Sequence, residues 1–464
     1  MRPARLREVA DALKAEIAGT SPLDSGGDEL VRGASVDSRK IRGGELFFAL
    51  QGQTDGADFA VQACRDGAVA VVADRPLEVP TLGVPEPLAA LQELARWTLS
   101  RDEAWKPEIT GITGTIGKTT TKDALATILR SAGRKVCATE GNFNNEIGLP
   151  LTVLSAGEHT EHLVLEMGAT HTGDIAHLCG IAAPRVGVLT AVSPVHLDSF
   201  GSLEDLAAAK GELAMALPED GALISPVDVP RSATGYGRDL KRRITFAPSK
   251  DQLGDLWASD IEERENGLYF VLHAEGEEAE VFTPVFGTHL VEPLLAACGG
   301  AIALGLTPAE CARGLARLKR TGLRGEVYRL KNDILVYDDS YNASPAAMIA
   351  VLRYGAAQAQ SQDRALVAVL GGMFELGAGA RAYHRETGEV AEEVGVDLLV
   401  CVGDEARWYA ETFSGPVALY EDAASAAAGL QKSLNGGEYV VVKGSRGVGL
   451  DSLTRELRER LTLV

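Results

Sequence analysis

The feature that most constrains the fold is a glycine-containing loop set between a buried strand and a helix. EITGITG (108–114) has the apolar run of a buried strand, and TTTKDALATILRSAG (119–133) has helical spacing and ends at a glycine. The loop between them is Thr113-Gly114-Thr115-Ile116-Gly117-Lys118-Thr119-Thr120. Glycines let such a loop aim backbone N–H groups at phosphate oxygens, and the following helix adds its positive end. We therefore expect a bound ATP, with Lys118 on its β- and γ-phosphates and Thr119 on Mg²⁺.

The spacing is a variant of the usual GxxxxGK[ST] pattern, because the first glycine comes two positions late, at Gly114. The plainer alternative is a glycine turn that caps a helix beside a chance Lys-Thr pair. The order strand, loop, helix favours the phosphate-binding interpretation.

Strand and helix patterns divide the chain into three parts. The first has short strands, ELFFAL and GAVAVVA, and closes with the helical stretch PLAALQELARWTLS. The second alternates strands and helices, and its period of two over 256–282 predicts antiparallel strands added to a parallel sheet. The third alternates strands such as RALVAVLGG with alanine-rich helices. The sequence thus predicts an α/β protein with a mixed N-terminal domain (1–103), a central P-loop ATPase-type domain with a parallel sheet (104–319) and a Rossmann-like, doubly wound C-terminal domain (320–464).

Charge and cysteine usage narrow the class of partner. Lys and Arg total 45 against 65 Asp and Glu, a net charge of -20, which disfavours nucleic acid and anionic lipid. The N-terminus lacks the unbroken apolar stretch of a secretory signal, and no later run is long enough to cross a membrane. The six cysteines form no CxxC pair, and four lie among small apolar residues, as buried thiols do. We expect a cytoplasmic monomer that acts on small molecules, without nucleic acid or a membrane span.

Three residues could complete a site beside the loop. Glu166 ends the apolar strand HLVLE, where a carboxylate needs a cation or several donors, although a helix-capping role is the plainer alternative. His196 follows the strand RVGVLTAV and should emerge at the same sheet edge, although a lone histidine is as often structural. Lys210 lies in AAAKGEL, and this pattern alone favours a lysine whose ammonium reaches solvent.

Seven segments together resemble the Mur ligases. They are, in order, TGTIGKTTTKD, GNFNNEIGLPLTVL, LEMGATHTGDIAHL, HLDSFGSLEDLAAAKGEL, DDSYNASPAAM, GGMFELGAGARAYHRETGE and VVKGSRG. The N-terminal SVDSRKIRGGELFFALQGQTDGADFA is similar to the part of these enzymes that grips a uridine diphosphate. The resemblance covers nearly the whole chain, and DSYNASP, AYHRETGE and KGSRG resemble the branch that adds a dipeptide.

This resemblance implies an ATP-dependent ligase of peptidoglycan biosynthesis, with a role in cell-wall biogenesis, cell shape and cell division. It implies that D-alanyl-D-alanine is joined to UDP-N-acetylmuramoyl-tripeptide through an acyl phosphate, with release of ADP and phosphate. It also implies two Mg²⁺ ions, one on Thr119 and Glu166 and the other on His196 and a carbamylated Lys210. The further residues that it assigns are Asn144 and Asn145 for orienting substrate at the phosphoryl group, Asp37, Ser38 and Arg39 for the uridine diphosphate, His289, Arg324 and Asp339 for the nucleotide, and Asn342, Lys443 and Arg446 for the incoming dipeptide.

At four positions the sequence departs from the family pattern. Ile116, Leu290 and Pro293 stand where the family has asparagine, and Gly372 stands where it has aspartate. Two alternatives follow, a divergent member with altered nucleotide or peptide specificity and a non-catalytic nucleotide- or substrate-binding protein. A P-loop kinase or transporter-type ATPase would not need the third domain, and a folate-polyglutamate-type ligase would not need DSYNASP and KGSRG. We favour an active ligase, because an inactive protein has no physical reason to keep buried metal and phosphate groups.

Overall fold

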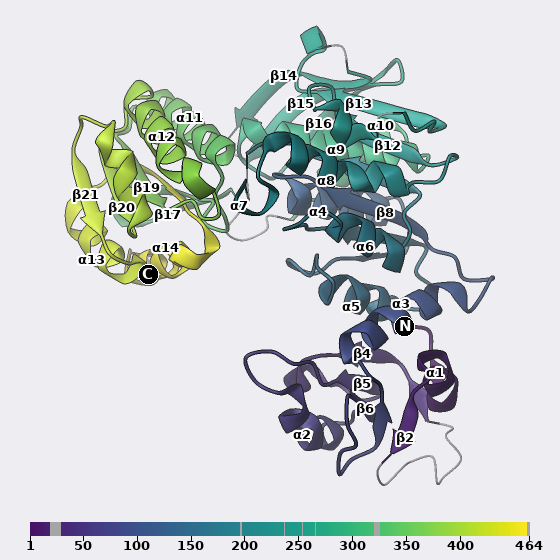
Figure 1. Ribbon diagram of the computed structural model, residues 1–464. Coiled ribbons are helices and arrows are strands. Elements are labelled where there is room, and N and C mark those ends of the chain that lie inside the picture. Colours follow the sequence, from purple (N-terminus) through teal and green to yellow (C-terminus); the bar gives the residue numbers. More distant parts are fainter. Residues whose placement is uncertain are drawn as a thin grey trace.

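The computed structural model describes residues 1–18, 29–194, 197–235, 237–252, 254–264, 266–319 and 325–461. Figure 1 shows three lobes, with the N-terminal lobe at the bottom, the central lobe above it and the C-terminal lobe at the left. Each lobe is built on its own sheet, of five, nine and six strands in turn. The predicted α/β fold class is confirmed. Among the described residues, none of the helices is both long enough and apolar enough to cross a bilayer.

The N-terminal lobe is a mixed sheet with helices packed on it. In spatial order its strands are β2 (Glu16–Ala18), β7 (Thr81–Gly83), β6 (Ala70–Ala73), β5 (Glu45–Phe48) and β4 (Gly33–Ser35). A separate pair is formed by β1 (Ala4–Arg5) and β3 (Leu30–Val31), and the helices are α1 (Leu6–Leu13), α2 (Ala60–Arg65) and α3 (Pro87–Ser100). β4 to β7 run parallel, whereas β2 pairs antiparallel with β7. β5 and β6 are almost wholly buried because their side chains are apolar on both faces.

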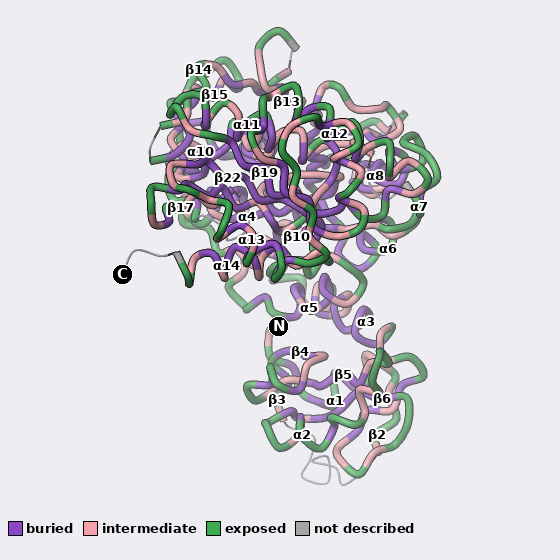
Figure 2. The backbone as a smooth tube through the Cα atoms, turned by 90° about the vertical axis from the view of Figure 1, so that its left-hand side faces the viewer, coloured by how far each residue is buried: buried purple, intermediate pink, exposed green. Residues whose placement is uncertain are grey.

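The N-terminal and central lobes share one apolar core. α3 packs on α5 (Gly148–Ser155), and a single buried cluster joins Leu91 and Leu94 of α3 to Leu149 and Val153 of α5. Figure 2 shows the N-terminal lobe set below the rest, with α3 and α5 at the junction. A shared apolar core resists relative motion, so we expect these two lobes to move together.

The central sheet places the glycine-containing loop at its middle. Its strands in spatial order are β16 (Glu277–Thr283), β15 (Gly267–Ala274), β14 (Leu256–Arg264), β13 (Arg242–Ala247), β12 (Ala222–Pro226), β11 (Val186–Leu189), β8 (Glu108–Thr113), β10 (His162–Glu166) and β9 (Val136–Ala138). β8 runs parallel to both of its neighbours, β10 and β11. Glu166 is in register with Ile112, so it ends its strand beside the loop. β15 pairs antiparallel with β14 and β16, which confirms the predicted antiparallel extension.

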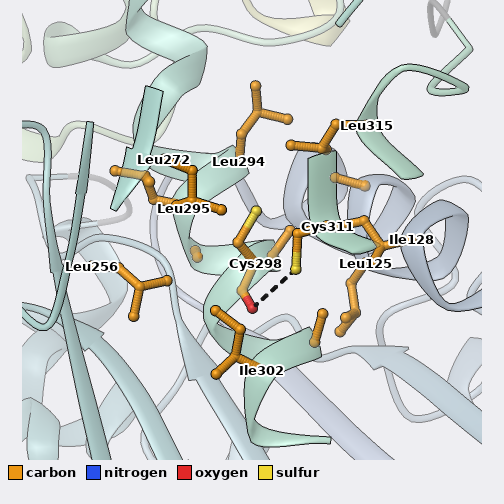
Figure 3. Close-up of a cluster of buried hydrophobic side chains, with 14 of the residues drawn as sticks. Leu125, Ile128, Leu256, Leu272, Leu294, Leu295, Cys298, Ile302, Cys311 and Leu315 are labelled. Carbon is orange, nitrogen blue, oxygen red and sulfur yellow. Dashed lines mark hydrogen bonds between the residues drawn. The ribbon is translucent and has the colours of Figure 1, made fainter. Parts of the chain in front are cut away.

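Helices cover both faces of this sheet. They are α4 (Lys118–Ser131), α9 (Val291–Ala303) and α10 (Pro308–Leu315) on one face, and α5, α6 (Asp174–Ile181) and α8 (Leu203–Ala216) on the other. Figure 3 shows the core of the first face, where Leu125 of α4 packs near Cys298 of α9 and Cys311 of α10. All six cysteines are free thiols and four of them are buried, as the sequence predicts.

The C-terminal lobe is a parallel sheet with one antiparallel edge. Its strands in spatial order are β17 (Glu326–Arg329), β18 (Leu335–Asp338), β22 (Tyr439–Lys443), β19 (Leu366–Gly371), β20 (Leu398–Val402) and β21 (Val417–Tyr420). The helices α11 (Pro345–Ser361) and α12 (Ala380–Glu393) cover one face, and α13 (Ala423–Ser433) and α14 (Leu450–Leu461) cover the other. Contacts to the central lobe are both polar and apolar, since Tyr354 donates to Glu263 at 2.5 Å and Phe286 is part of the buried apolar cluster of the C-terminal lobe.

Candidate active site

Two glycines give the loop between β8 and α4 its shape. Gly114 has φ +141° and Gly117, which precedes the first residue of α4, has φ +82°. A Cβ at Gly114 would lie 2.1 Å from the hydroxyl of Thr190, and one at Gly117 would lie 2.9 Å from the ring of Pro293. Both positions therefore need glycine for backbone conformation and for space.

The segment after β11 holds this loop in place. The Thr115 N–H donates to Ala191 O at 3.0 Å, and the Thr190 hydroxyl donates to Ile116 O at 2.5 Å. The hydroxyls of Thr115 and Ser193 lie 2.9 Å apart. Sequence reasoning missed Thr190 and Ser193, although hydroxyl residues directly after an apolar strand that neighbours the loop strand are a signal that could have found them.

The Lys118 ammonium lies inside the curve of the loop. Its Nζ donates to Gly114 O at 2.7 Å and to Thr115 O at 3.2 Å. The side chain is half-buried, at the positive end of a helix fourteen residues long. These carbonyls are contacts that phosphate oxygens can replace, and the arrangement is suited to bind a polyphosphate.

Glu166, Thr119 and Asn144 meet beside the loop. Glu166 is 2% exposed, and its two carboxylate oxygens accept from the Thr119 hydroxyl at 2.9 Å and from the Asn144 amide at 2.8 Å. The Glu166 N–H donates to the Thr139 hydroxyl at 3.0 Å, which fixes the strand end. A hydroxyl and a carboxylate in contact are the hard oxygen donors that Mg²⁺ prefers, with water in its other positions. Within the described residues no three His, Cys, Asp or Glu side chains gather as a metal site.

Lys210 is buried, so the expectation of an ammonium that reaches solvent is wrong. The residue is 2% exposed in α8, and its Nζ donates to Ala169 O at 3.4 Å and lies over the ring of Phe200 at 5.5 Å. Burial, followed by repulsion from Lys118, lowers the pKa of Lys210 to about 7. Pattern alone missed this because the burial comes from Ala169 and Phe200, which lie outside the AAAKGEL segment.

Two of the other predicted residues have separate surroundings. Asn145 is exposed, and its side-chain amide oxygen accepts from the N–H of Gly148, the first residue of α5, at 2.9 Å. His196 lies outside the described residues. The structure thus gathers Lys118, Thr119, Asn144 and Glu166 into one site.

The C-terminal lobe presents a charged rim at the ends of β18 and β22. Lys443 is 4% exposed, forms an ion pair with Asp339 and donates to Asn342 O at 3.0 Å. Arg446 is exposed and lies over the ring of Tyr341 at 5.6 Å. Arg324 lies outside the described residues. Carboxyl ends of parallel strands are the usual ligand-binding edge of such a sheet, so these groups are placed to meet a substrate.

The predicted uridine-diphosphate residues belong to the N-terminal lobe and are not gathered with the loop. Asp37 accepts from the N–H of Arg39 at 3.1 Å and from its guanidinium at 2.9 and 3.0 Å. This pairing lowers the pKa of Asp37, and Ser38 beside it is buried. The Lys40 ammonium lies 5.3 Å from the ring centroid of Phe143, and Phe143 is the residue before Asn144. This contact links the N-terminal lobe to the segment that reaches Glu166.

His289 lies at the junction of the central and C-terminal lobes. Its Nε2 is 3.4 Å from the Tyr337 hydroxyl, and within the described part of the chain its buried Nδ1 has no hydrogen-bond partner. Burial lowers the pKa of His289 to about 4, outweighing the attraction of Asp339. The imidazole is therefore neutral at pH 7 in the folded chain.

We expect this histidine to make folding stability fall in acid. An unfolded histidine takes up a proton near pH 6.5, whereas folded His289 does so near pH 4. The contribution of His289 to the free energy of unfolding is thus complete above about pH 6.5. Between about pH 6.5 and pH 4 it falls by up to about 1.4 kcal/mol per pH unit. Denaturant unfolding at pH 7 and pH 5 measures this loss of folding stability, and the His289→Asn variant, which lacks the titrating group, is the control. A difference between the two proteins that is the same at both pH values would contradict the prediction.

The structure shows how the residues at the four positions that depart from the family pattern are accommodated. Pro293 lies in the first turn of α9, where a missing N–H costs little, and its carbonyl accepts from the Thr121 hydroxyl at 3.1 Å. Leu290 is half-buried against the core of the first face, and Ile116 contributes its carbonyl to Thr190. A Cβ at Gly372 would lie 3.5 Å from the Glu405 carboxylate. An aspartate there would bring two carboxylates together, which fits glycine at this position.

Comparison with known proteins finds one family over the three lobes. The Mur ligase middle domain matches residues 112–301, the Mur ligase glutamate ligase domain matches 323–446, and the Mur ligase family catalytic domain matches 30–98. Proteins named UDP-N-acetylmuramoyl-tripeptide--D-alanyl-D-alanine ligase from Bacillus subtilis and Escherichia coli are each 32% identical. They align over 98% of this chain and over 98% and 99% of their own length.

Solved structures agree with these matches. MurF from Acinetobacter baumannii superposes with a TM-score of 0.85 at 26% identity, over 98% of this chain and 99% of that chain. MurF ligase from Thermotoga maritima, in complex with ADP, has a TM-score of 0.78 at 31% identity, over 93% and 99% of the two chains. With the phosphate-binding loop and full-length likeness together, the chain belongs to the Mur ligase family and is of the MurF type.

Proposed function

We propose that this chain is an ATP-dependent ligase that joins D-alanyl-D-alanine to UDP-N-acetylmuramoyl-tripeptide in peptidoglycan synthesis. The observation that carries the proposal is the buried contact of Glu166 with Thr119, directly beside the loop that encloses Lys118. Full-length likeness to ligases of this name supports the choice of substrates. Release of ADP and phosphate accompanies each new amide bond.

The first half-reaction makes the tripeptide carboxylate reactive. A carboxylate is a poor electrophile until one of its oxygens becomes a good leaving group. Attack of that oxygen on the γ-phosphorus of ATP gives an acyl phosphate and ADP. Loop N–H groups and Lys118 would stabilise the charge on the phosphoryl oxygens, in a site where few waters compete.

The second half-reaction forms the amide bond. The dipeptide amine attacks the acyl carbonyl carbon, loses a proton, and phosphate leaves from the tetrahedral intermediate. Lys443, Asn342 and Arg446 at the rim of the C-terminal lobe would bind the incoming dipeptide, whose carboxylate suits the positive charge of Lys443 and Arg446 and the amide donor of Asn342. The rim must come to the phosphate loop, so we propose closure of the C-terminal lobe onto the central lobe.

We also propose that Mg²⁺ assists this chemistry. Thr119 and Glu166 fit one ion as hard oxygen ligands, and the ion would supply charge neutralisation at the transferring phosphoryl group. A second ion would be held by His196 and by Lys210 in carbamylated form. Buried Nδ1 of His289, together with Asp339, would contact the nucleotide, and Asp37, Ser38 and Arg39 the uridine diphosphate.

We place this reaction in the cytoplasm, where ATP and nucleotide-linked precursors are available, and propose that the chain acts as a monomer. The net charge of -20 argues against a nucleic-acid partner. Because peptidoglycan bears the load of the cell wall, loss of the activity is expected to affect cell shape and division.

Purified protein with ATP, Mg²⁺, the UDP-linked tripeptide and D-alanyl-D-alanine tests the proposal. We expect one ADP and one phosphate for each new UDP-linked pentapeptide. Neither should be released unless the UDP-linked tripeptide and D-alanyl-D-alanine are both present. Phosphate release that ignores either substrate would reject the ligase. Omitting D-alanyl-D-alanine and trapping with hydroxylamine should give the hydroxamate of the tripeptide, which reports the acyl phosphate separately.

The same assay with GTP tests the alternative of altered nucleotide preference. Leu290 and Pro293 carry no side-chain donor or acceptor for a base, and Pro293 is instead packed on Gly117. If base recognition depends on these positions, kcat/KM for GTP will lie within about tenfold of the ATP value, since one lost hydrogen bond is worth about 1 kcal/mol. A much larger preference for ATP would show that other groups recognise adenine.

A further inference from the structure

His384, in the segment AYHRETGE, is fully buried in α12. Its Nε2 accepts from the Met373 N–H at 3.0 Å, and its Nδ1 lies 2.7 Å from Ala380 O. A carbonyl can only accept and a backbone N–H can only donate, so the proton must be on Nδ1 and the lone pair on Nε2. Burial lowers the pKa of His384, which keeps this neutral tautomer.

The bond from His384 fixes a loop that follows β19. This ligase loop, residues 372–379, is also held by the Phe374 N–H donating to the Ser445 hydroxyl at 2.9 Å. In return the Ser445 N–H donates to Gly372 O at 3.1 Å. The loop is thus tied both to α12 and to the segment between Lys443 and Arg446, where the dipeptide is proposed to bind.

The far end of the ligase loop meets the central lobe. Gly377 has φ +63°, and a Cβ there would lie 2.1 Å from the Asp198 carboxylate, in α7 (Leu197–Phe200). In Figure 1 α7 lies between the central and C-terminal lobes. His384 therefore acts at one end of a loop whose other end is seated on the lobe that holds ATP.

We propose that His384 is a positioning residue for amide-bond formation. Its Nε2 lone pair holds the Met373 N–H, so that the ligase loop is seated on Asp198 and aligns the dipeptide rim with the acyl phosphate. This inference rests on the proposed ligase function. His384 itself touches neither substrate nor the reacting atoms, and Trp408, Tyr409 and Glu405 lie around its ring.

Two variants, each of which matches one ring nitrogen of His384, distinguish loss of the hydrogen bond to Met373 from loss of side-chain packing. Glutamine places its Oε1 where Nε2 was and can still accept from Met373, whereas asparagine reaches only the Nδ1 position and can satisfy Ala380 alone. We expect His384→Asn to lower kcat about tenfold, the effect of one lost hydrogen bond to a buried N–H, and to raise KM for D-alanyl-D-alanine. His384→Gln should stay within about threefold of wild type by the same measure. Binding of the UDP-linked tripeptide should be unchanged in both.

A third variant tests the contact between Gly377 and Asp198 and leaves His384 unchanged. Gly377→Val introduces a branched side chain against Asp198 at a positive φ, and should lower kcat in the same direction as His384→Asn. Equal activity of the Asn and Gln variants, whether both normal or both impaired, would overturn the proposal, as would a normal kcat in Gly377→Val. The wild-type assay is run first, so that absence of ligation there counts against the proposed function and not against His384.

Discussion

Replacing Lys118 by alanine is expected to abolish ligation and leave binding of the uridine substrate intact. The Lys118 ammonium lies inside the loop curve, 2.7 Å from Gly114 O, where phosphate oxygens would take over its contacts. Removing a preorganised charge from a phosphoryl-transfer site costs about 3–4 kcal/mol of transition-state stabilisation, so kcat should fall by about two to three orders of magnitude. The uridine end is proposed to bind at Asp37 and Arg39 on another lobe, and titration calorimetry with the UDP-linked tripeptide should give the wild-type Kd.

Lys118→Arg is the matched control, because it keeps the charge but not the compact head that fits within the loop. We expect it to be partly active and to show raised KM for ATP. Loss of uridine-substrate binding in Lys118→Ala, in step with loss of turnover, would contradict separate sites on separate lobes. Hydroxamate trapping should show that acyl phosphate formation is the step lost.

The fold class and the position of the phosphate-binding loop could be predicted from the sequence, because both follow from short local patterns. Buried parallel strands are continuous apolar runs, so β8, β10, β11 and β19 could each be predicted from a few residues. The positive φ angles of Gly114 and Gly117 belong to the loop itself, whereas the space that glycine leaves there is needed by Thr190 and Pro293, far along the chain. Glu166 could be placed beside it because neighbouring parallel strands end at one edge.

Long-range packing is what sequence pattern could not supply. Nothing near Lys210 in sequence shows that Phe200 and Ala169 enclose it. Pro293 departs from the family residue, yet it packs on Gly117, some 170 residues earlier in the chain, and this contact is visible only once α9 is docked. Similarly, the tautomer of His384 follows from Met373 and Ala380 together, which no periodicity reveals.

Replacement of Lys210 is expected to lower activity as severely as loss of a metal ligand, and small carboxylates should restore part of it. Lys210 is 2% exposed, and its pKa is lowered to about 7 by burial and by Lys118. At pH 7 about half of such amines are neutral, against fewer than about one in a thousand for an ordinary lysine. A neutral amine adds to CO₂ and releases a proton to give a carbamate, which replaces repulsion from Lys118 with attraction.

The test compares Lys210→Ala with Lys210→Arg. Alanine leaves a cavity that formate or acetate can fill, so added carboxylate should raise its kcat severalfold. Arginine fills the cavity and cannot form a carbamate, so carboxylate should leave its low activity unchanged. In the wild type, activity should rise with added bicarbonate in degassed buffer and should fall as pH drops below about 7, since protonation of the amine removes the carbamate. Wild-type indifference to bicarbonate, together with full activity of the arginine variant, would show that position 210 serves as a buried cation.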